Sequence, residues 1–363
     1  MSNTEKIPFS RNELKKIGSY GTCSKLNTPV TPKENLLRAI RHQNPLWVPL
    51  RSDEVNFLPR VMPDNVARAF VVEAVPYKGP VGGKDMFGVE WEYMPEVGGC
   101  MVRPGHPLME DANDWKEVIH FPDVDSWDWE TSAKENTCYR TEDRYVISCI
   151  FTGFYERLIS FMEFENAIVA LIDEDQKDAV LELFQALVEL YKKILYKLKY
   201  YFNIDAIFFH DDWGGQKNSF FSPDTCREMI APYLKQVVDY CHSIDIVFDF
   251  HSCGKIENMI PVMIECGVDK WAGQPINDKA KLIQLYGDKI LIGSTDDISP
   301  APGEPEPTPE EYAERVEMHM KKYGSGLPEK MFFLMVKDCK DGTLTAFYEA
   351  GRKILCGTAD EDR

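Results

Sequence analysis

The sequence lacks a long uninterrupted apolar run, since no stretch approaches the roughly 18 residues that a membrane-spanning helix needs. It also lacks an excess of positive charge: 41 Lys and Arg stand against 59 Asp and Glu, which gives a formal net charge of −18. Nucleic-acid binding depends on clustered Lys and Arg. We therefore expect neither a nucleic-acid nor a membrane partner.

Regular cysteine spacing is missing as well. The ten cysteines are scattered, and a chain of 363 residues buries enough core to need no disulfide framework. The opening residues, MSNTEKIPFSRNELKK, contain no apolar segment typical of a signal peptide. Reduced thiols in a cytoplasmic protein are the expectation.

From residue 144 onward, apolar runs alternate with helical stretches at 176–201, 224–243 and 308–324. The runs, preceded by NPLWVPLR (44–51), are YVISCIF, IDAIFF, DIVFDF, VDKWA, KILIG and MFFLMV. Strands that alternate with helices of this length predict a parallel sheet. We expect an α/β fold, a (β/α)8 TIM-type barrel, with seven of its eight strands identified.

The N-terminal third is less regular. Residues 1–30 are interpreted as an extended or poorly ordered arm, and residues 31–363 as a single barrel domain that opens with a helix capped by Thr31. Residues 52–143 are interpreted as an irregular insertion that shapes the substrate pocket. Within it, GVEWEYMPEVGGCMVRP (88–104) predicts a hairpin.

Polar residues follow five successive predicted strands, as HDDWGGQ, HSCG, GQ, STDD and KDC. In a barrel, catalytic residues gather at the carboxyl ends of the strands. The sequence therefore predicts one site to which several strands contribute.

His251 and Cys253 are one residue apart in DFHSCGK, so in extended backbone they face the same side. Imidazole and thiolate are zinc ligands, and Cys339, past the last predicted strand, is the candidate third ligand. Three such ligands leave one open position, as catalytic zinc sites do. Two alternatives are structural cysteines and the D-x-H-x-x-G pattern of cobalamin-binding domains, which here lacks its later Ser-x-Leu and Gly-Gly elements.

His210, Asp211 and Asp212 are candidate catalytic residues, because adjacent carboxylates can hold a proton or orient a ligand. The alternatives are a capped turn and a packing histidine. A further spacing, Glu174-x14-Glu189-x20-His210, is associated with zinc in aromatic O-demethylase methyltransferases. One helix over 175–201 would hold the two carboxylates roughly 22 Å apart, which excludes them as ligands of one zinc. Glu189 is expected to pair with a neighbouring lysine instead.

The order FYERLISFMEFENAI, HDDWGGQ, HSCG, IECGVDKWAGQP and GSTD resembles the uroporphyrinogen decarboxylase-like methyltransferases over roughly residues 31 to 356, and among them methyltransferase I of aromatic O-demethylase systems. The resemblance implies a (β/α)8 barrel that exchanges methyl groups with a corrinoid carried by a separate protein. It also implies zinc held by His251, Cys253 and Cys339, although MVKDCKDG around Cys339 departs from the family's Gly-rich pattern.

The resemblance predicts methyl transfer from a phenyl methyl ether to cobalt(I) of a corrinoid protein, with zinc as Lewis acid and the three catalytic candidates as proton donors. The alternatives are a methylcorrinoid:thiol methyltransferase, a uroporphyrinogen-type decarboxylase and a non-catalytic barrel. The decarboxylase is disfavoured because VPLRSDEVNF holds only Arg51, where those enzymes place several arginines. A homodimer is compatible with all of them. The expected substrate-binding residues are Arg51, Trp91, Tyr93, Phe154, Trp213, Gln216 and Gln274.

Overall fold

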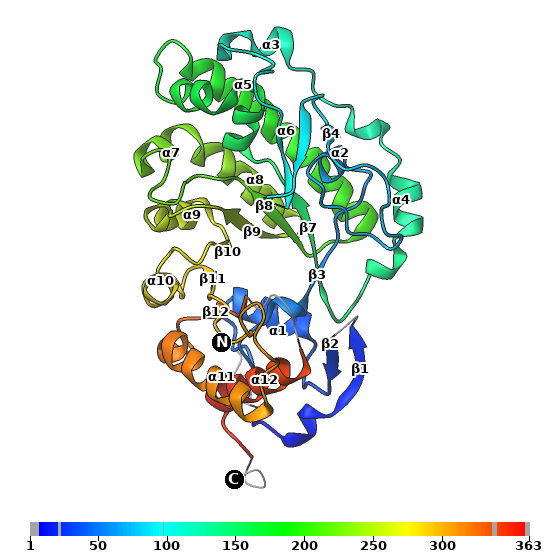
Figure 1. Cartoon of the computed structure of the whole chain (residues 1–363), viewed down its shortest axis with the longest axis vertical. Coiled ribbons are helices and arrows are strands. Elements are labelled where there is room, and N and C mark those ends of the chain that lie inside the picture. The colour runs from blue at the N-terminus through cyan, green and yellow to red at the C-terminus, as the bar shows by residue number, and fades with distance from the viewer. Residues whose placement is uncertain (1–6, 21–22, 97, 336–339, 360–363) are drawn as a thin grey trace. The chain divides into compact units, whose positions relative to one another are not determined.

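The structure, a computed structural model, describes residues 7–20, 23–96, 98–335 and 340–359. These residues divide into two compact units (Figure 1). The first unit holds 7–55, 142–145 and 277–359, and the second holds 56–141 and 146–276. Each is described in turn.

Parallel strands organise both units. In the second, β7 (Tyr145–Ile150), β8 (Ala206–His210), β9 (Val247–Ser252) and β10 (Lys270–Gly273) lie side by side in chain order (Figure 1). In the first, β11 (Leu291–Gly293) pairs in parallel with β12 (Phe332–Phe333). With β3 (Glu54–Asn56) the set has seven strands in the described part of the chain. The predicted α/β barrel-type fold is confirmed, with seven of the eight strands of a complete barrel.

The first strand differs from its predicted bounds of 44–51. Leu50 makes only an isolated parallel bridge to Leu334, and the 3-10 turn η2 (Arg51–Asp53) then interrupts the extended chain before β3. The cause is local, because Pro45 and Pro49 have no N–H to donate to a ladder.

The helices alternate with the strands as predicted. The helix α6 (Lys177–Phe202) contains neither Gly nor Pro, buries Leu183, Leu187, Ile194 and Leu198 along one face, and ends where Asn203 turns left-handed. The predicted helix 224–243 is two, α7 (Pro223–Met229) and α8 (Ala231–Ser243), because Pro232 starts a new helix. The other helices are α1 (Pro32–Ile40), α2 (Pro63–Ala67), α3 (Trp115–Val118), α4 (Trp129–Glu135), α5 (Phe154–Ala170), α9 (Ile260–Cys266), α10 (Lys279–Tyr286), α11 (Pro309–Tyr323) and α12 (Asp341–Cys356).

The N-terminal segment is more ordered than an extended arm. Within the described residues it forms the 3-10 helix η1 (Arg11–Leu14) and the antiparallel strands β1 (Lys16–Tyr20) and β2 (Cys23–Leu26). Glu13 accepts hydrogen bonds from Arg352 and Tyr348 of α12, all three being buried. This buried ion pair ties the segment to the last helix, a long-range contact that no local pattern reveals.

Two local predictions are confirmed. Thr31 caps α1 through the N–H of Glu34, and the predicted hairpin is the antiparallel pair β5 (Glu90–Met94) and β6 (Gly99–Val102), extended by β4 (Gly83–Lys84). In the described part of the chain, every helix is too short or too polar to cross a membrane.

Candidate metal centre

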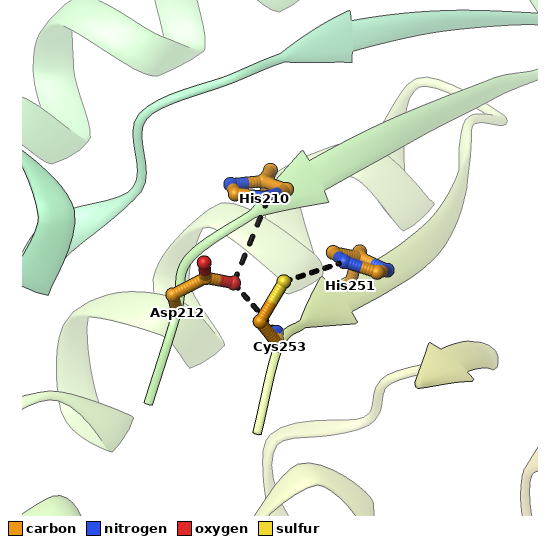
Figure 2. Close-up of side chains that lie close together, drawn as sticks. All are labelled: His210, Asp212, His251 and Cys253. Carbon is orange, nitrogen blue, oxygen red and sulfur yellow. Dashed lines mark hydrogen bonds and ion pairs between the residues drawn. The ribbon is translucent and has the colours of Figure 1, made fainter. Parts of the chain in front are cut away.

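Four potential metal ligands meet where β8 and β9 end in the second unit. His210, Asp212, His251 and Cys253 each offer one ligand atom, and these four atoms lie within 4.8 Å of one another (Figure 2). The sequence predicts His251 and Cys253 as ligands and His210 and Asp212 as catalytic residues, and the fold brings all four together. The third predicted ligand, Cys339, lies outside the described residues.

Strand register explains the meeting. His210 of β8 is paired with His251 of β9, and paired residues of parallel strands project to the same face. The two imidazoles stack, with ring centroids 5.0 Å apart and planes inclined by 17°. Asp212 and Cys253 each follow their histidine by two residues, so both point back toward the same side.

The loops after the two strands are fastened to each other. Gly254 has a φ of +92°, and a Cβ there would lie 2.2 Å from the backbone of Gly214. The N–H of Trp213 donates to Ser252 Oγ at 2.8 Å, and that of Lys255 to the Gly215 carbonyl at 2.8 Å. Glycine at 254 is therefore required by the close approach of two backbones.

The donor spacing matches a tetrahedral metal site. Cys253 Sγ lies 3.6 Å from His251 Nε2, and His210 Nε2 lies 3.6 Å from Asp212 Oδ1. With zinc bonds of about 2.0–2.3 Å, ligand atoms at tetrahedral angles are separated by about 3.3–3.6 Å. The N–H of Cys253 also donates to Asp212 Oδ1 at 2.5 Å, which joins the two loops at the site. The four residues thus fit zinc in chemistry, and two of their donor separations match its tetrahedral spacing, with all four atoms within 4.8 Å of one another.

The second ring nitrogen of His210 is already engaged. Its Nδ1 lies 2.5 Å from Glu156 Oε2, and Arg68 lies 3.7 Å from the other oxygen of Glu156. Burial lowers the pKa of His210 to about 4, although the Asp212 carboxylate opposes the shift. Burial raises the pKa of Glu156 to about 7, and the charge of Arg68 opposes this. Burial thus favours the neutral form of His210.

Cys253 is a thiol in the absence of a cation. Burial, followed by the nearby Asp212 carboxylate, raises its pKa to about 12. Metal binding at this position would release the thiol proton, as thiolate coordination does generally.

Asp211 has a different environment from its neighbour. It is fully buried, and its oxygens accept hydrogen bonds from the N–H groups of Tyr155 (3.2 Å) and Glu156 (2.8 Å) in the first turn of α5. A third comes from the indole of Trp213 at 2.9 Å. Burial, reinforced by Glu156, raises the pKa of Asp211 to about 7. In this position the carboxylate stabilises the start of a helix.

The predicted substrate-binding residues are dispersed. Phe154 and Trp213 are completely buried, and Phe154 packs against Phe184, Tyr191 and Phe209 behind the strands. Gln274 accepts the Gly254 N–H at 3.0 Å and so borders the donor loops. Trp91 is buried, and its indole donates to Asp85. Tyr93 and Gln216 are exposed, and Arg51 belongs to the other unit.

The carboxylates of the x14–x20 spacing are not at the donor cluster. Glu174 and Glu189 form exposed pairs with Lys177 and Lys192, at 2.8 and 3.0 Å. The expectation that Glu189 pairs with a neighbouring lysine on one long helix is confirmed.

Glu156 and Arg68 were missed by the sequence reasoning. Arg68 contacts Glu156 and lies 4.5 Å from the ring centroid of Trp91 and 5.7 Å from that of Phe151. The only local signal was the FYERLI segment, which marks Glu156 as part of a motif without indicating what it contacts.

A separate cavity of about 340 Å³ lies within the first unit. Trp47, Asp53 and Tyr348 are among its lining residues, and none of the predicted site residues lines it. It therefore contributes nothing to the donor cluster.

Comparison with known proteins identifies a solved structure of similar fold. No protein-family model matches the sequence, and neither does any curated protein. Among solved structures, a methyltransferase from Methanosarcina mazei superposes with a TM-score of 0.58 at 15% identity, covering 90% of this chain and 99% of that one. An Old Yellow Enzyme from Pichia sp. AKU4542 superposes with a TM-score of only 0.34 at 8% identity, over 58% of this chain and 62% of its own. The chain thus shares its overall fold with a methyltransferase.

Proposed function

We propose that this protein is a methyltransferase that moves a methyl group from a methoxylated aromatic to the cobalt(I) of a corrinoid carried by a separate protein, with zinc at the donor cluster. The observation that carries the proposal is the set of His210, Asp212, His251 and Cys253 at the ends of two neighbouring strands. The motif resemblance and the fold shared with a methyltransferase support it. In barrels of this class, reactive groups gather at that end of the strands.

His251 and Cys253 would hold the metal, with His210 and Asp212 completing the set. When bound, zinc would supply a Lewis acid that stabilises the negative charge on the departing phenolate oxygen. Neighbouring residues hold the ligands in place. Asp212 accepts a hydrogen bond from the Cys253 N–H, and the Phe208 ring stacks on His251 with centroids 5.3 Å apart. The corrinoid is a substrate, and its cobalt(I) takes the methyl group as the C–O bond breaks.

The experiment combines the purified zinc-loaded protein, free cob(I)alamin and a panel of phenyl methyl ethers such as guaiacol under anaerobic conditions. Methylcobalamin absorbance should grow with at least one ether, and His251→Ala and Cys253→Ala should abolish the growth. Cys138→Ala, which removes an exposed free cysteine, is the matched control and should keep full activity.

Two results would contradict the proposal. If no ether of the panel produced methylcobalamin, and the protein instead moved the methyl group of methylcobalamin to a thiol, it would be a thiol methyltransferase. A folded protein that binds no metal would indicate a non-catalytic barrel.

A further inference from the structure

Nδ1 of His210 and Oε2 of Glu156 lie 2.5 Å apart, so the position of the shared proton decides what His210 can do at the cluster. An imidazole that donates Nδ1–H to a carboxylate keeps a lone pair on Nε2. That nitrogen lies 3.6 Å from Asp212 Oδ1, on the side of His251 and Cys253. With the Nδ1 proton directed at Glu156, Nε2 carries no proton toward the site and is free to serve as a metal ligand.

Glu156 is itself held in place. It is the third residue of α5, its side chain is 14% exposed, and its backbone N–H is fixed by Asp211. Arg68 lies 3.7 Å from the Glu156 oxygen that His210 does not use, and Arg68 NH1 donates to Thr152 Oγ1 at 3.4 Å. The guanidinium also lies over the Trp91 ring. Arg68 thus borders one oxygen of the carboxylate while His210 contacts the other, and the backbone of Glu156 is held by Asp211.

We propose that Glu156, backed by Arg68, is a positioning residue that fixes the tautomer and ring orientation of His210, so that the metal centre takes the His210 donor of β8 in addition to His251 and Cys253. This inference rests on the metal site of the proposed function. Carboxylates that orient metal-binding histidines contribute about 10–100-fold to metal affinity in other proteins. The site would then be assembled from α5, β8 and β9 together.

The test measures metal affinity, without catalysis. Zn²⁺ affinity is determined by competition with a chromophoric chelator, and Co²⁺ is added separately because its visible absorption reports coordination number and thiolate binding. Glu156→Ala should weaken Zn²⁺ binding about 10–100-fold and change the intensity of the Co²⁺ bands. Glu156→Gln, whose amide oxygen can still accept the Nδ1 proton, should lie between Glu156→Ala and the parent.

The controls separate this inference from the metal site itself. Glu165→Gln changes an exposed glutamate on the same helix and should match the parent. His210→Ala should reproduce the Co²⁺ spectrum of Glu156→Ala, and thermal melting identifies any variant that has lost its fold. Should Glu156→Ala misfold, Glu156→Gln and Arg68→Met carry the test, each with a smaller expected loss of affinity.

Parental affinity and spectrum in the folded Glu156 variants, with loss in His251→Ala, would overturn the positioning role and leave the metal site intact. Parental affinity in His251→Ala and Cys253→Ala as well would overturn the metal site of the proposed function.

Discussion

Two adjacent carboxylates, Asp211 and Asp212, should give opposite phenotypes when each is replaced by alanine. Asp211 accepts three hydrogen bonds from buried donors, whereas Asp212 is 28% exposed and belongs to the donor cluster. We expect Asp211→Ala to reduce stability more than metal binding. Asp212→Ala should weaken metal binding while the protein stays folded.

The magnitude follows from the number of donors left without an acceptor. Each buried unsatisfied N–H costs about 1–3 kcal/mol, and at about 1–2 kcal/mol each the three groups give a loss of about 3–6 kcal/mol. The entropy of unfolding is about 2.1 cal/mol/K per residue, or about 0.8 kcal/mol/K for 363 residues. The melting temperature of Asp211→Ala should therefore fall by about 4–8 °C. Asp211→Asn keeps one acceptor oxygen and should fall by about half as much.

The assay pairs thermal denaturation, followed by circular dichroism, with zinc content after dialysis. Asp212→Ala is the matched control, because it removes the same group one residue away. The reasoning is refuted if Asp211→Ala melts within about 1 °C of the parent, or if it loses zinc while Asp212→Ala retains it.

Three further changes test other parts of the structure. Gly254→Ala forces a left-handed conformation and a 2.2 Å contact on the new side chain, so denaturant unfolding should show a loss of about 3 kcal/mol or more; an unchanged midpoint would contradict the geometry. Glu189→Ala should leave zinc content unchanged and cost less than about 0.5 kcal/mol, because its pair with Lys192 is exposed; loss of zinc would restore the x14–x20 spacing as a ligand set. Burial lowers the pKa of Lys279 to about 7, so the unfolded state binds more protons above that pH and stability should rise between about pH 7 and 10; Lys279→Met should flatten this rise, and an unaltered slope would show that Lys279 is charged when folded.

Local patterns in the sequence were sufficient for the fold class and for half of the donor set. Alternating apolar runs and helical stretches identify parallel strands because both periodicities are local. The one-residue separation of His251 and Cys253 is informative for the same reason, because residues two apart in a strand share one face. The predicted bounds of a strand differ from the structure at Pro49, which cannot donate to a ladder, and those of a helix differ where Pro232 starts a second helix.

The partners of His210 could not be predicted, because they depend on distant parts of the chain. Glu156 and Arg68 are 54 and 142 residues away from His210 in sequence, and no periodicity connects them. Phe154 shows a second limit. It follows the end of β7 by four residues, and as the first residue of α5 it packs against Phe184 of α6; helical phase at a first turn is not visible in a short motif.

The contact between Gly254 and Gly214 has a consequence for how a metal enters and leaves. Because the two backbones touch, the loops that carry Asp212 and Cys253 cannot separate without breaking several hydrogen bonds at once. The entropy of bringing the donors together is then lost when the chain folds, before any ion arrives. A centre preorganised in this way gains little from relaxing around an ion of the wrong size. In the metal site proposed above, the close glycine contact would therefore favour an ion that fits the preset donor spacing.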